Sequence, residues 1–389
     1  MMRACIVGMG HTRFGKMDGL DIEDLIASAA REAIVDAEID PAEIDAVWLG
    51  HYNGGLVPDG FCSSMILHVD PALRYKPAVR VENACATGSS AIQSAIDAVN
   101  SGRCRVALVV GAEKMTALDT AGVTKVLAGA SYQREERGMT FPQIFASYAT
   151  AYAETFGDPT EAMARIAVKN HANAMRNPLA QMHRPVDLDH CMTVSDKNPM
   201  IADPLKLSDC SLISDGAAAV VIADKSLVAN FRRVVSFRAA ETVSDYLPLS
   251  AKRLAYFEGP TRAVAQAYAS AGVTVDDIDL AEVHDCFTIA ELLSVEALGL
   301  AQPGEGREVV RQGQTERDGR LPINVSGGLK AKGHPIGATG VSMHVMIARQ
   351  LLGEAGEMQL ARQPQLGLCF NMGGGAVTSA VSVLEPLKQ

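Results

Sequence analysis

The sequence lacks three patterns that would each indicate a particular class of protein. It contains no run of about 18 apolar residues, so no transmembrane helix is expected. Its eight cysteines include no Cys-x-x-Cys pair, so neither a disulfide framework nor a zinc ribbon is indicated. Its glycine-rich runs lack the Gly-x-Gly-x-x-Gly spacing after a first strand. We therefore expect no metal, flavin or nicotinamide cofactor.

Basic residues are also in short supply, since 35 Lys and Arg face 45 Asp and Glu and give a net charge of −10. A nucleic-acid partner is not expected, because binding to phosphates needs a dense basic face. The N-terminal residues 1–8 have the pattern of a strand rather than of a signal peptide, so we expect a cytoplasmic location and reduced thiols. With 389 residues, 48% of them hydrophobic, the chain can bury two or more core units.

Cys85 stands at the start of a predicted helix that runs from about Ala86 to Asn100, with small residues on both sides. A thiol at a helix N-terminus faces unpaired backbone N–H groups and the positive end of the helix dipole, which lower its pKa and favour the thiolate. Small neighbours would let an extended substrate approach closely. From its position alone, Cys85 is either a nucleophile or a buried core thiol.

A glycine-rich loop between Asn324 and Gly340 carries His334 and leads into a predicted helix from about Ala338 to Leu352. The unperturbed pKa of histidine is about 6.5, so the ring can take and return a proton near neutrality. Such a histidine can act as the general base of a thiolate nucleophile. The alternative is a structural role for a single loop histidine.

Four segments, taken together, resemble the thiolase superfamily over the whole chain. They are the Cys85 turn, the His334 loop, the strand end Glu282-Val283-His284-Asp285-Cys286-Phe287, and the run Gly367-Leu368-Cys369-Phe370-Asn371-Met372-Gly373-Gly374-Gly375. The His-Asp-Cys-Phe block resembles the sterol-carrier-protein-type branch, where other thiolases carry Asn-Glu-Ala-Phe. The resemblance implies a coenzyme-A-dependent acyltransferase.

The chain repeats the order helix, Asp-rich turn and strand, which supports the fold independently of this resemblance. The first helix runs from about Ile22 to Ala37 and the second from about Thr261 to Gly272. Each copy then reaches a loop, a helix and an apolar strand, at about 106–111 and 366–371. This alternation predicts an α/β fold of parallel or mixed sheets covered by helices, in which the packed copies bring Cys85 and His334 together. The resemblance implies the five-layer αβαβα arrangement of two similar halves.

We predict three units along the chain. Residues 1–117 and 208–252 form the N-terminal half with Cys85, and residues 253–389 form the C-terminal half with His284, His334 and Cys369. Residues 118–207 form an inserted loop domain, which by resemblance covers coenzyme A. Basic side chains there would meet the phosphates of coenzyme A, unless they only form a solvated mixed-charge surface. The candidates are Arg165, Lys169, His171, Arg176, His183, Arg184, Lys197 and Lys206.

The resemblance also implies roles for residues of the site. Cys85, deprotonated by His334, would attack an acyl carbonyl, and the backbone N–H groups of Cys85 and Asn371 would stabilise the oxyanion. The usual family motif there is Cys-x-Gly, and an asparagine adopts the backbone angles of glycine less readily. A second oxyanion hole would consist of His334 and His284, although His284 could instead be a strand-end histidine bonded to the backbone. The glycines expected to bind substrate are Gly333, Gly337 and Gly374.

Two cysteines compete to be the second acid/base, which moves the α-proton of acetyl-CoA. Cys369 aligns with the acid/base cysteine of most thiolases, whereas Cys286 lies in the block that resembles the sterol-carrier-protein branch. We favour Cys286, because the Cys-Phe-Asn run departs from the pattern that normally carries Cys369, and we expect the other cysteine to have a packing role.

We interpret the chain as a thiolase, an acetyl-CoA acyltransferase or acetyltransferase, that cleaves 3-ketoacyl-CoA or condenses acyl-CoA units through an acyl-Cys85 intermediate. Its partners would be acyl-CoA and coenzyme A, in a homodimer or homotetramer. One alternative is a ketosynthase-like condensing enzyme, since Cys85, His284 and His334 also form a Cys-His-His set. Another is a non-catalytic subunit with a small acyl-CoA-binding partner, against which the three intact residues argue.

Overall fold

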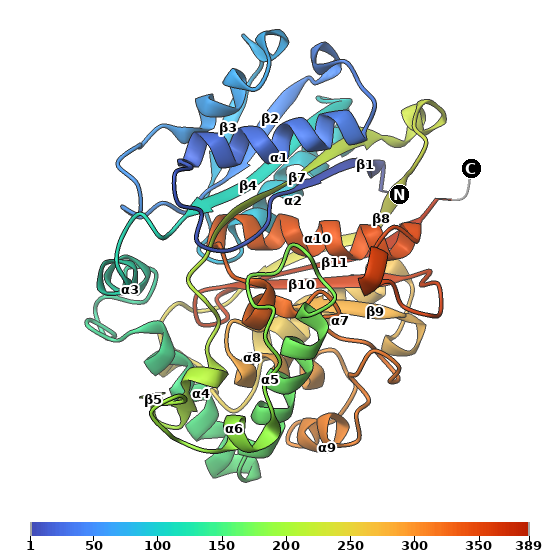
Figure 1. The fold of residues 1–389 in the computed structure, drawn as a ribbon. Helices are drawn as coiled ribbons and strands as arrows, with labels where there is room; N and C mark the ends of the chain where they lie inside the picture. Colours follow the sequence, from blue (N-terminus) through green and yellow to red (C-terminus); the bar gives the residue numbers. More distant parts are fainter. Residues whose placement is uncertain (1, 388–389) are drawn as a thin grey trace.

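The computed structural model describes residues 2–387 and contains a nine-stranded sheet in the order β3-β2-β4-β7-β1-β8-β11-β10-β9 (Figure 1). The first five strands are β3 (Ala78–Val81), β2 (Ala46–Gly50), β4 (Val106–Lys114), β7 (Asp215–Asp224) and β1 (Ala4–His11). The other four are β8 (Val235–Ser244), β11 (Thr378–Pro386), β10 (Gly367–Gly373) and β9 (Leu280–Val283). Strands β1 and β8 pair only at Cys5–Ser236 and Ile6–Val235, so this short ladder joins two half-sheets.

Helices cover both half-sheets and fill the space between them (Figure 1). Helix α1 (Ile22–Asp36) lies on the outer face of the first half, and α7 (Glu258–Ala271) and α8 (Thr288–Ala297) lie outside the second. Helices α2 (Thr87–Asn100) and α10 (Ile336–Leu352) pack against each other in the middle. The result is the five-layer αβαβα fold, which confirms the predicted fold class and the mixed pairing of its sheets.

Local sequence explains why the central helices can approach so closely. Every residue of α10 is buried except Arg349 and Leu352, so this helix has no solvent face. A Cβ atom on Gly88 would lie 2.8 Å from the backbone nitrogen of Val341, and one on Gly111 would lie 2.5 Å from the carbonyl oxygen of Gly337. Small residues are therefore required where α2, α10 and β4 meet, and this meeting point brings the N-termini of both helices together.

The segment between β4 and β7 contributes helices and a two-stranded ribbon on one side of the layers (Figure 1). It contains α3 (Thr120–Ala128), α4 (Phe141–Phe156), α5 (Thr160–Ala174), α6 (Leu188–Met192), β5 (Met200–Ala202) and β6 (Leu205–Lys206). Helices α4 and α5 pack against α8, and α9 (Gly306–Arg311) packs against α5 and α8. The domain boundaries given above stay a prediction.

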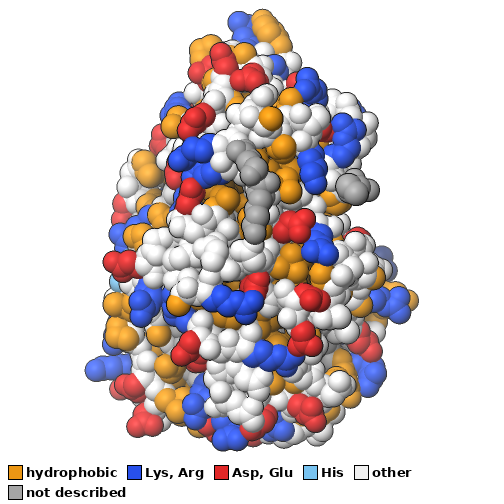
Figure 2. All heavy atoms as spheres, turned by 90° about the vertical axis from the view of Figure 1, so that its right-hand side faces the viewer, with side chains coloured by type: hydrophobic (Ala, Val, Ile, Leu, Met, Phe, Trp, Pro, Cys, Tyr) orange, Lys and Arg blue, Asp and Glu red, His pale blue; other side chains and the backbone are white. Residues whose placement is uncertain are grey.

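The molecular surface mixes charges of both signs. On the face drawn in Figure 2, acidic, basic and hydrophobic side chains are interspersed. Within residues 2–387, no helix has both the length and the apolar character that a membrane crossing would require.

Candidate active site

Cys85 lies in a tight turn between β3 and α2. Ala84 has a φ of +47°, which is uncommon for a residue with a side chain. The turn is held because the Thr87 hydroxyl donates to the carbonyl oxygen of Ala84 at 2.5 Å and accepts from the backbone N–H of Asn83 at 2.8 Å. Cys85 is partly exposed, whereas the other seven cysteines are buried and all eight are free. It is therefore the thiol that an incoming molecule reaches first.

The C-terminal half brings two histidines to Cys85. His284 follows β9, and His334 precedes α10. The Cys85 sulfur and one ring nitrogen from each histidine all lie within 4.8 Å of one another. The two rings meet edge to face, with centroids 5.1 Å apart and planes at 85°. The pseudo-repeat of the chain thus brings the Cys85 thiol from one half and both imidazoles from the other.

The two candidate acid/base cysteines occupy different places. Cys286 lines a small cavity together with Cys85 and His334. Cys369 lies in β10 with its sulfur 3.6 Å from Nδ1 of His344, and it is not among the residues that line this cavity. The geometry therefore brings Cys286, and not Cys369, to the space in front of Cys85.

The backbone N–H groups that the structure brings to the Cys85 sulfur do not include that of Asn371, so its role as an oxyanion donor stays a prediction. The N–H groups that reach the Cys85 sulfur are those of Gly374 and of Cys85 itself. The backbone of Asn371 lies inside the ladder of β10, opposite Ala380 of β11, and its side chain enters the site instead. Gly374, with a φ of +63°, follows the end of this strand, so its N–H is free to face the sulfur.

The other predicted glycines pack against protein. A Cβ atom on Gly333 would lie 2.8 Å from the Ser214 hydroxyl, and one on Gly337 would lie 2.4 Å from the carbonyl oxygen of Ala112. These two glycines are thus explained by close packing of the His334 loop, while Gly374 lines the cavity.

Three of the basic residues proposed for coenzyme A are unavailable to it, because they are buried among protein groups. Lys169 pairs with Glu291 at 2.7 Å, Lys206 pairs with Asp209 at 2.9 Å, and His171 is 3% exposed. Arg165 pairs with Glu161 on the surface. The remaining candidates, Arg176, His183, Arg184 and Lys197, are exposed.

The protonation states also differ from the sequence-based expectation of a thiolate. Burial, together with the nearby Glu113 carboxylate, raises the pKa of Cys85 to about 12, although the N–H groups of Gly374 and Cys85 lower it in part. Burial and the Lys332 charge lower the pKa of His334 to about 3. Desolvation raises the pKa of Cys85 by more than the helix N-terminus can lower it, so the resting pair is a neutral thiol and a neutral imidazole.

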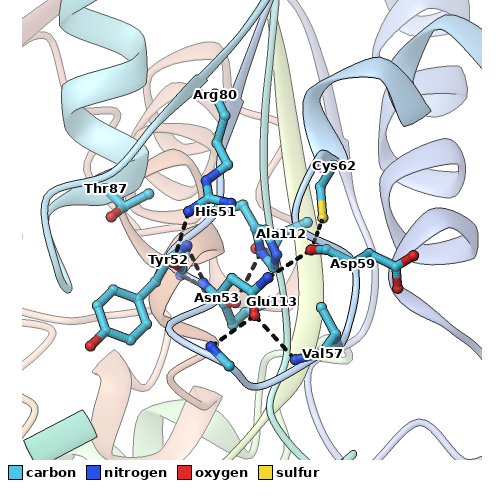
Figure 3. A network of polar contacts seen from close by, with 12 residues as sticks. His51, Tyr52, Asn53, Val57, Asp59, Cys62, Arg80, Thr87, Ala112 and Glu113 are labelled. Atoms are coloured by element: carbon cyan, nitrogen blue, oxygen red, sulfur yellow. Dashed lines mark hydrogen bonds and ion pairs between the residues drawn. The ribbon is translucent and has the colours of Figure 1, made fainter. Parts of the chain in front are cut away.

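Glu113, at the end of β4, organises the wall of the site and carried no recognisable signal in the sequence (Figure 3). Its carboxylate accepts the backbone N–H groups of Tyr52, Asn53 and Gly337 at 3.0–3.1 Å and lies 2.9 Å from Nδ1 of His51. Burial lowers the pKa of His51, but Glu113 and the Cys62 thiol raise it more, to about 10. This buried ion pair therefore ties the Tyr52 segment to the start of α10.

The three clustered side chains are of the types that bind zinc, since thiolate and imidazole are both zinc ligands. Binding would require Cys85 to lose its proton, which burial opposes. Our expectation that the protein works without a metal stays a prediction.

Two family models match the chain. The one described as "Thiolase, N-terminal domain" matches residues 4–226, and "Thiolase C-terminal domain-like" matches residues 240–386. A relative named "Acetyl-CoA acetyltransferase" from Methanothermobacter thermautotrophicus is 38% identical over 99% of this chain and 100% of its own length. Human "Sterol carrier protein 2" is 32% identical over 97% of this chain and 71% of its own length.

Solved structures share the fold. One titled "Ltp2-ChsH2(DUF35) aldolase" has a TM-score of 0.84 and 24% identity, over 100% of this chain and 98% of that one. Human mitochondrial 3-ketoacyl-CoA thiolase has a TM-score of 0.75 and 18% identity, over 100% of this chain and 99% of that one. At these identities the likeness concerns the fold alone.

Proposed function

Since this chain belongs to the thiolase family, we propose that it is a coenzyme-A-dependent acyltransferase that works through an acyl-Cys85 intermediate. The observation that carries the proposal is the cluster of the Cys85 sulfur with nitrogens of His284 and His334 at a small apolar cavity. A thiol, a base and backbone N–H donors in one place are the groups that acyl transfer needs.

The first half-reaction uses Cys85 and His334. The Cys85 thiol gives its proton to Nε2 of His334, which is buried with no hydrogen-bond partner among the described residues, and the sulfur attacks the acyl carbonyl carbon. The N–H groups of Cys85 and Gly374 stabilise the oxyanion until the leaving group, coenzyme A or an enolate, departs.

Cys286 moves the other proton. In thiolysis its thiol protonates the acetyl-CoA enolate as the carbon–carbon bond breaks and Cys85 becomes acylated; in the second half-reaction the resulting Cys286 thiolate takes the proton of free coenzyme A, whose sulfur attacks the acyl carbonyl, and Cys85 leaves and regains its proton from His334. Condensation follows the same steps in reverse, so the Cys286 thiolate that removes the α-proton of acetyl-CoA forms when its thiol protonates the departing coenzyme A. His284 and His334 lie where they can stabilise the enolate oxygen. Burial beside Cys85 and Asp285 holds the pKa of Cys286 well above its ordinary value, which keeps this thiol protonated at rest and suits the donor role in thiolysis.

The proposed substrate is a short acyl chain, with acetoacetyl-CoA as the first choice. The cavity in front of Cys85 is small, with a volume of about 60 Å³. Phe145 and Phe287 stack across its wall with centroids 4.7 Å apart, and Leu127 and Phe141 also line it. The name of the relative from Methanothermobacter thermautotrophicus agrees with an acetyl group.

The experiment is cleavage of acetoacetyl-CoA by free coenzyme A with the pure chain and no acyl carrier protein. We expect formation of acetyl-CoA and an acetyl adduct on Cys85 by mass spectrometry, both lost in Cys85→Ala. Cys104→Ala is the matched control, because this buried thiol lies in the core away from the cavity and should leave the reaction intact. Activity that requires a carrier protein would favour a ketosynthase-like enzyme.

A second candidate keeps the same chemistry but places it in a larger assembly. The solved structure with the TM-score of 0.84 is titled as a pair of proteins, which supports a partner polypeptide for this chain as well. We also expect a homodimer or homotetramer. If the pure chain is inactive alone and becomes active with an added partner, the result favours the assembly. Light scattering at micromolar protein reports the oligomeric state.

A further inference from the structure

Asn371 departs from the Cys-x-Gly motif, and its side chain makes two contacts inside the site. Its amide nitrogen Nδ2 lies 3.2 Å from the carbonyl oxygen of Cys85 and 2.8 Å from Nδ1 of His284. The residue is fully buried, on β10. One side chain therefore joins the nucleophile turn of the first half to the histidine of the second.

The contact with Cys85 fixes which way the amide points. A backbone carbonyl oxygen can only accept a hydrogen bond, so the atom beside it must be the NH₂ group and not the amide oxygen. The NH₂ group has two hydrogens, and Nδ1 of His284 lies at 2.8 Å, within hydrogen-bond reach of the second. Since an NH₂ group only donates, Nδ1 of His284 must be the unprotonated nitrogen, and the proton of the neutral ring must be on Nε2.

We propose that Asn371 is a positioning residue that locks His284 in the Nε2–H tautomer, so that His284 serves as an oxyanion donor and cannot serve as a second base. The proposal rests on the proposed function, because it assigns a role within the enolate half-reaction. The sequence suggested only a backbone role for Asn371, whereas this proposal gives a role to its side chain.

The second histidine shows the contrast. Nδ1 of His334 lies 2.7 Å from the hydroxyl oxygen of Thr339, which can accept as well as donate. His334 can therefore carry its proton on Nδ1 and keep Nε2 free to take the Cys85 proton. Two neighbouring imidazoles thus receive opposite roles because one faces a hydroxyl and the other an amide.

The fold leaves space for this amide. A Cβ atom on Gly340 would lie 2.6 Å from the Asn371 side-chain oxygen, so the glycine of the His334 loop accommodates the larger residue on β10. Burial and the proximity of His334 hold the pKa of His284 well below its ordinary value, so the neutral ring is the form that the amide must orient.

The test compares wild type with Asn371→Asp, which keeps the shape but removes the NH₂ group. A carboxylate accepts a proton from Nδ1 of His284 and stabilises the imidazolium, so it reverses the tautomer. We expect ¹⁵N NMR of histidine-labelled wild type, assigned with His284→Gln, to show Nε2–H and bare Nδ1. The variant should show Nδ1–H or a doubly protonated ring.

The kinetic readouts separate positioning from loss of structure. Deuterium exchange into acetyl-CoA should fall about 10²–10³-fold in Asn371→Asp, while acylation of Cys85 changes less than about tenfold. Its pH profile should gain an ionisation that the wild type lacks, because the carboxylate raises the pKa of His284. Asn371→Leu should lose exchange to a similar extent without the new ionisation.

Asn100→Asp is the matched control: the side-chain oxygen of Asn100 accepts from the backbone N–H of Arg3, aspartate retains that oxygen, and the Asn100 NH₂ group makes only a 3.5 Å contact with the Met2 sulfur. A wild-type His284 with its proton on Nδ1, or an unchanged exchange rate in Asn371→Asp, would overturn the proposal. If the wild type lacked acyl transfer altogether, the proposed function would fail, yet the NMR result would still decide the tautomer.

Discussion

The assignment of Cys286 over Cys369 can be decided by replacing each cysteine with alanine. Both are buried, at 6% and 1% exposure, so neither substitution disturbs the surface. Only Cys286 lines the cavity that contains Cys85. A group that moves the α-proton must reach the acetyl methyl, whereas a packing thiol need only fill volume. The two variants should therefore differ in catalysis but resemble each other in stability.

The expected magnitudes follow from these positions. Removing a buried sulfur of about the size of a methyl group should cost each variant about 1 kcal/mol of unfolding free energy, the range seen for Ile→Val in cores. Loss of a positioned acid/base is typically about 10²–10⁴-fold in rate. We expect that loss in Cys286→Ala, and a change of less than about tenfold in Cys369→Ala.

Deuterium uptake into acetyl-CoA measures the proton step directly, and the thiolysis rate measures the full cycle. Acylation of Cys85, followed by mass spectrometry, should persist in both variants because it does not involve the α-proton. Chemical denaturation reports whether their stabilities match. Equal kinetic losses would mean that the thiols act jointly or both support the site. The reverse order would refute the geometric reasoning and assign the proton step to Cys369.

Three further predictions follow from the protonation states. Iodoacetamide should label Cys85 before the seven buried thiols, at a rate that keeps rising with pH above neutrality, since the pKa of Cys85 is raised to about 12. Labelling that levels off near neutrality would contradict the neutral resting thiol. Glu113→Gln should lower the unfolding free energy by about 3–5 kcal/mol, because it leaves the buried His51 charge unpaired. The same variant should speed alkylation of Cys85, because Glu113 raises the pKa of that thiol. A variant as stable as wild type would exclude the buried ion pair. Burial lowers the pKa of His171 and of His344 to about 4, so below pH 6.5 the unfolded chain binds more protons than the folded chain. The unfolding free energy should therefore fall by about 1.4 kcal/mol per pH unit for each ring, down to about pH 4, which denaturation midpoints would measure. A flat profile would show that both rings are charged in the folded protein.

The fold was predictable because its signals are repeated and local. Two copies of helix, turn and strand indicated two half-sheets, and the helices expected at 86–100 and 338–352 occur as α2 and α10 with ends shifted by one or two residues. The family resemblance and the fold class are confirmed. The pairing of β1 with β8 carried no signal, because it rests on two residue pairs between strands more than 200 positions apart.

The candidate site was predictable in its residue types and less so in its electrostatics. Cys85, His284 and His334 stand in recognisable motifs, and the structure brings them together, although their roles stay predictions. The thiolate expected at a helix terminus did not follow, because desolvation depends on what packs over the site and cannot be read from a local motif. Glu113 was missed for the same reason, since its partners come from segments about 60 and 224 residues away.

The neutral resting pair has a consequence for how the site reacts. With the pKa of Cys85 raised to about 12 and that of His334 lowered to about 3, the thiolate–imidazolium pair is strongly disfavoured before substrate enters. In the proposed mechanism the proton therefore moves as the sulfur bonds to carbon, because the negative charge then passes to the acyl oxygen and its backbone donors. The N–H groups of Cys85 and Gly374 are already fixed by the turn and by the end of β10, so they need no rearrangement at that moment. In this mechanism the negative charge therefore forms where the fold already holds donors for it, and before an acyl carbonyl is in place the Cys85 thiol stays neutral and a weak nucleophile.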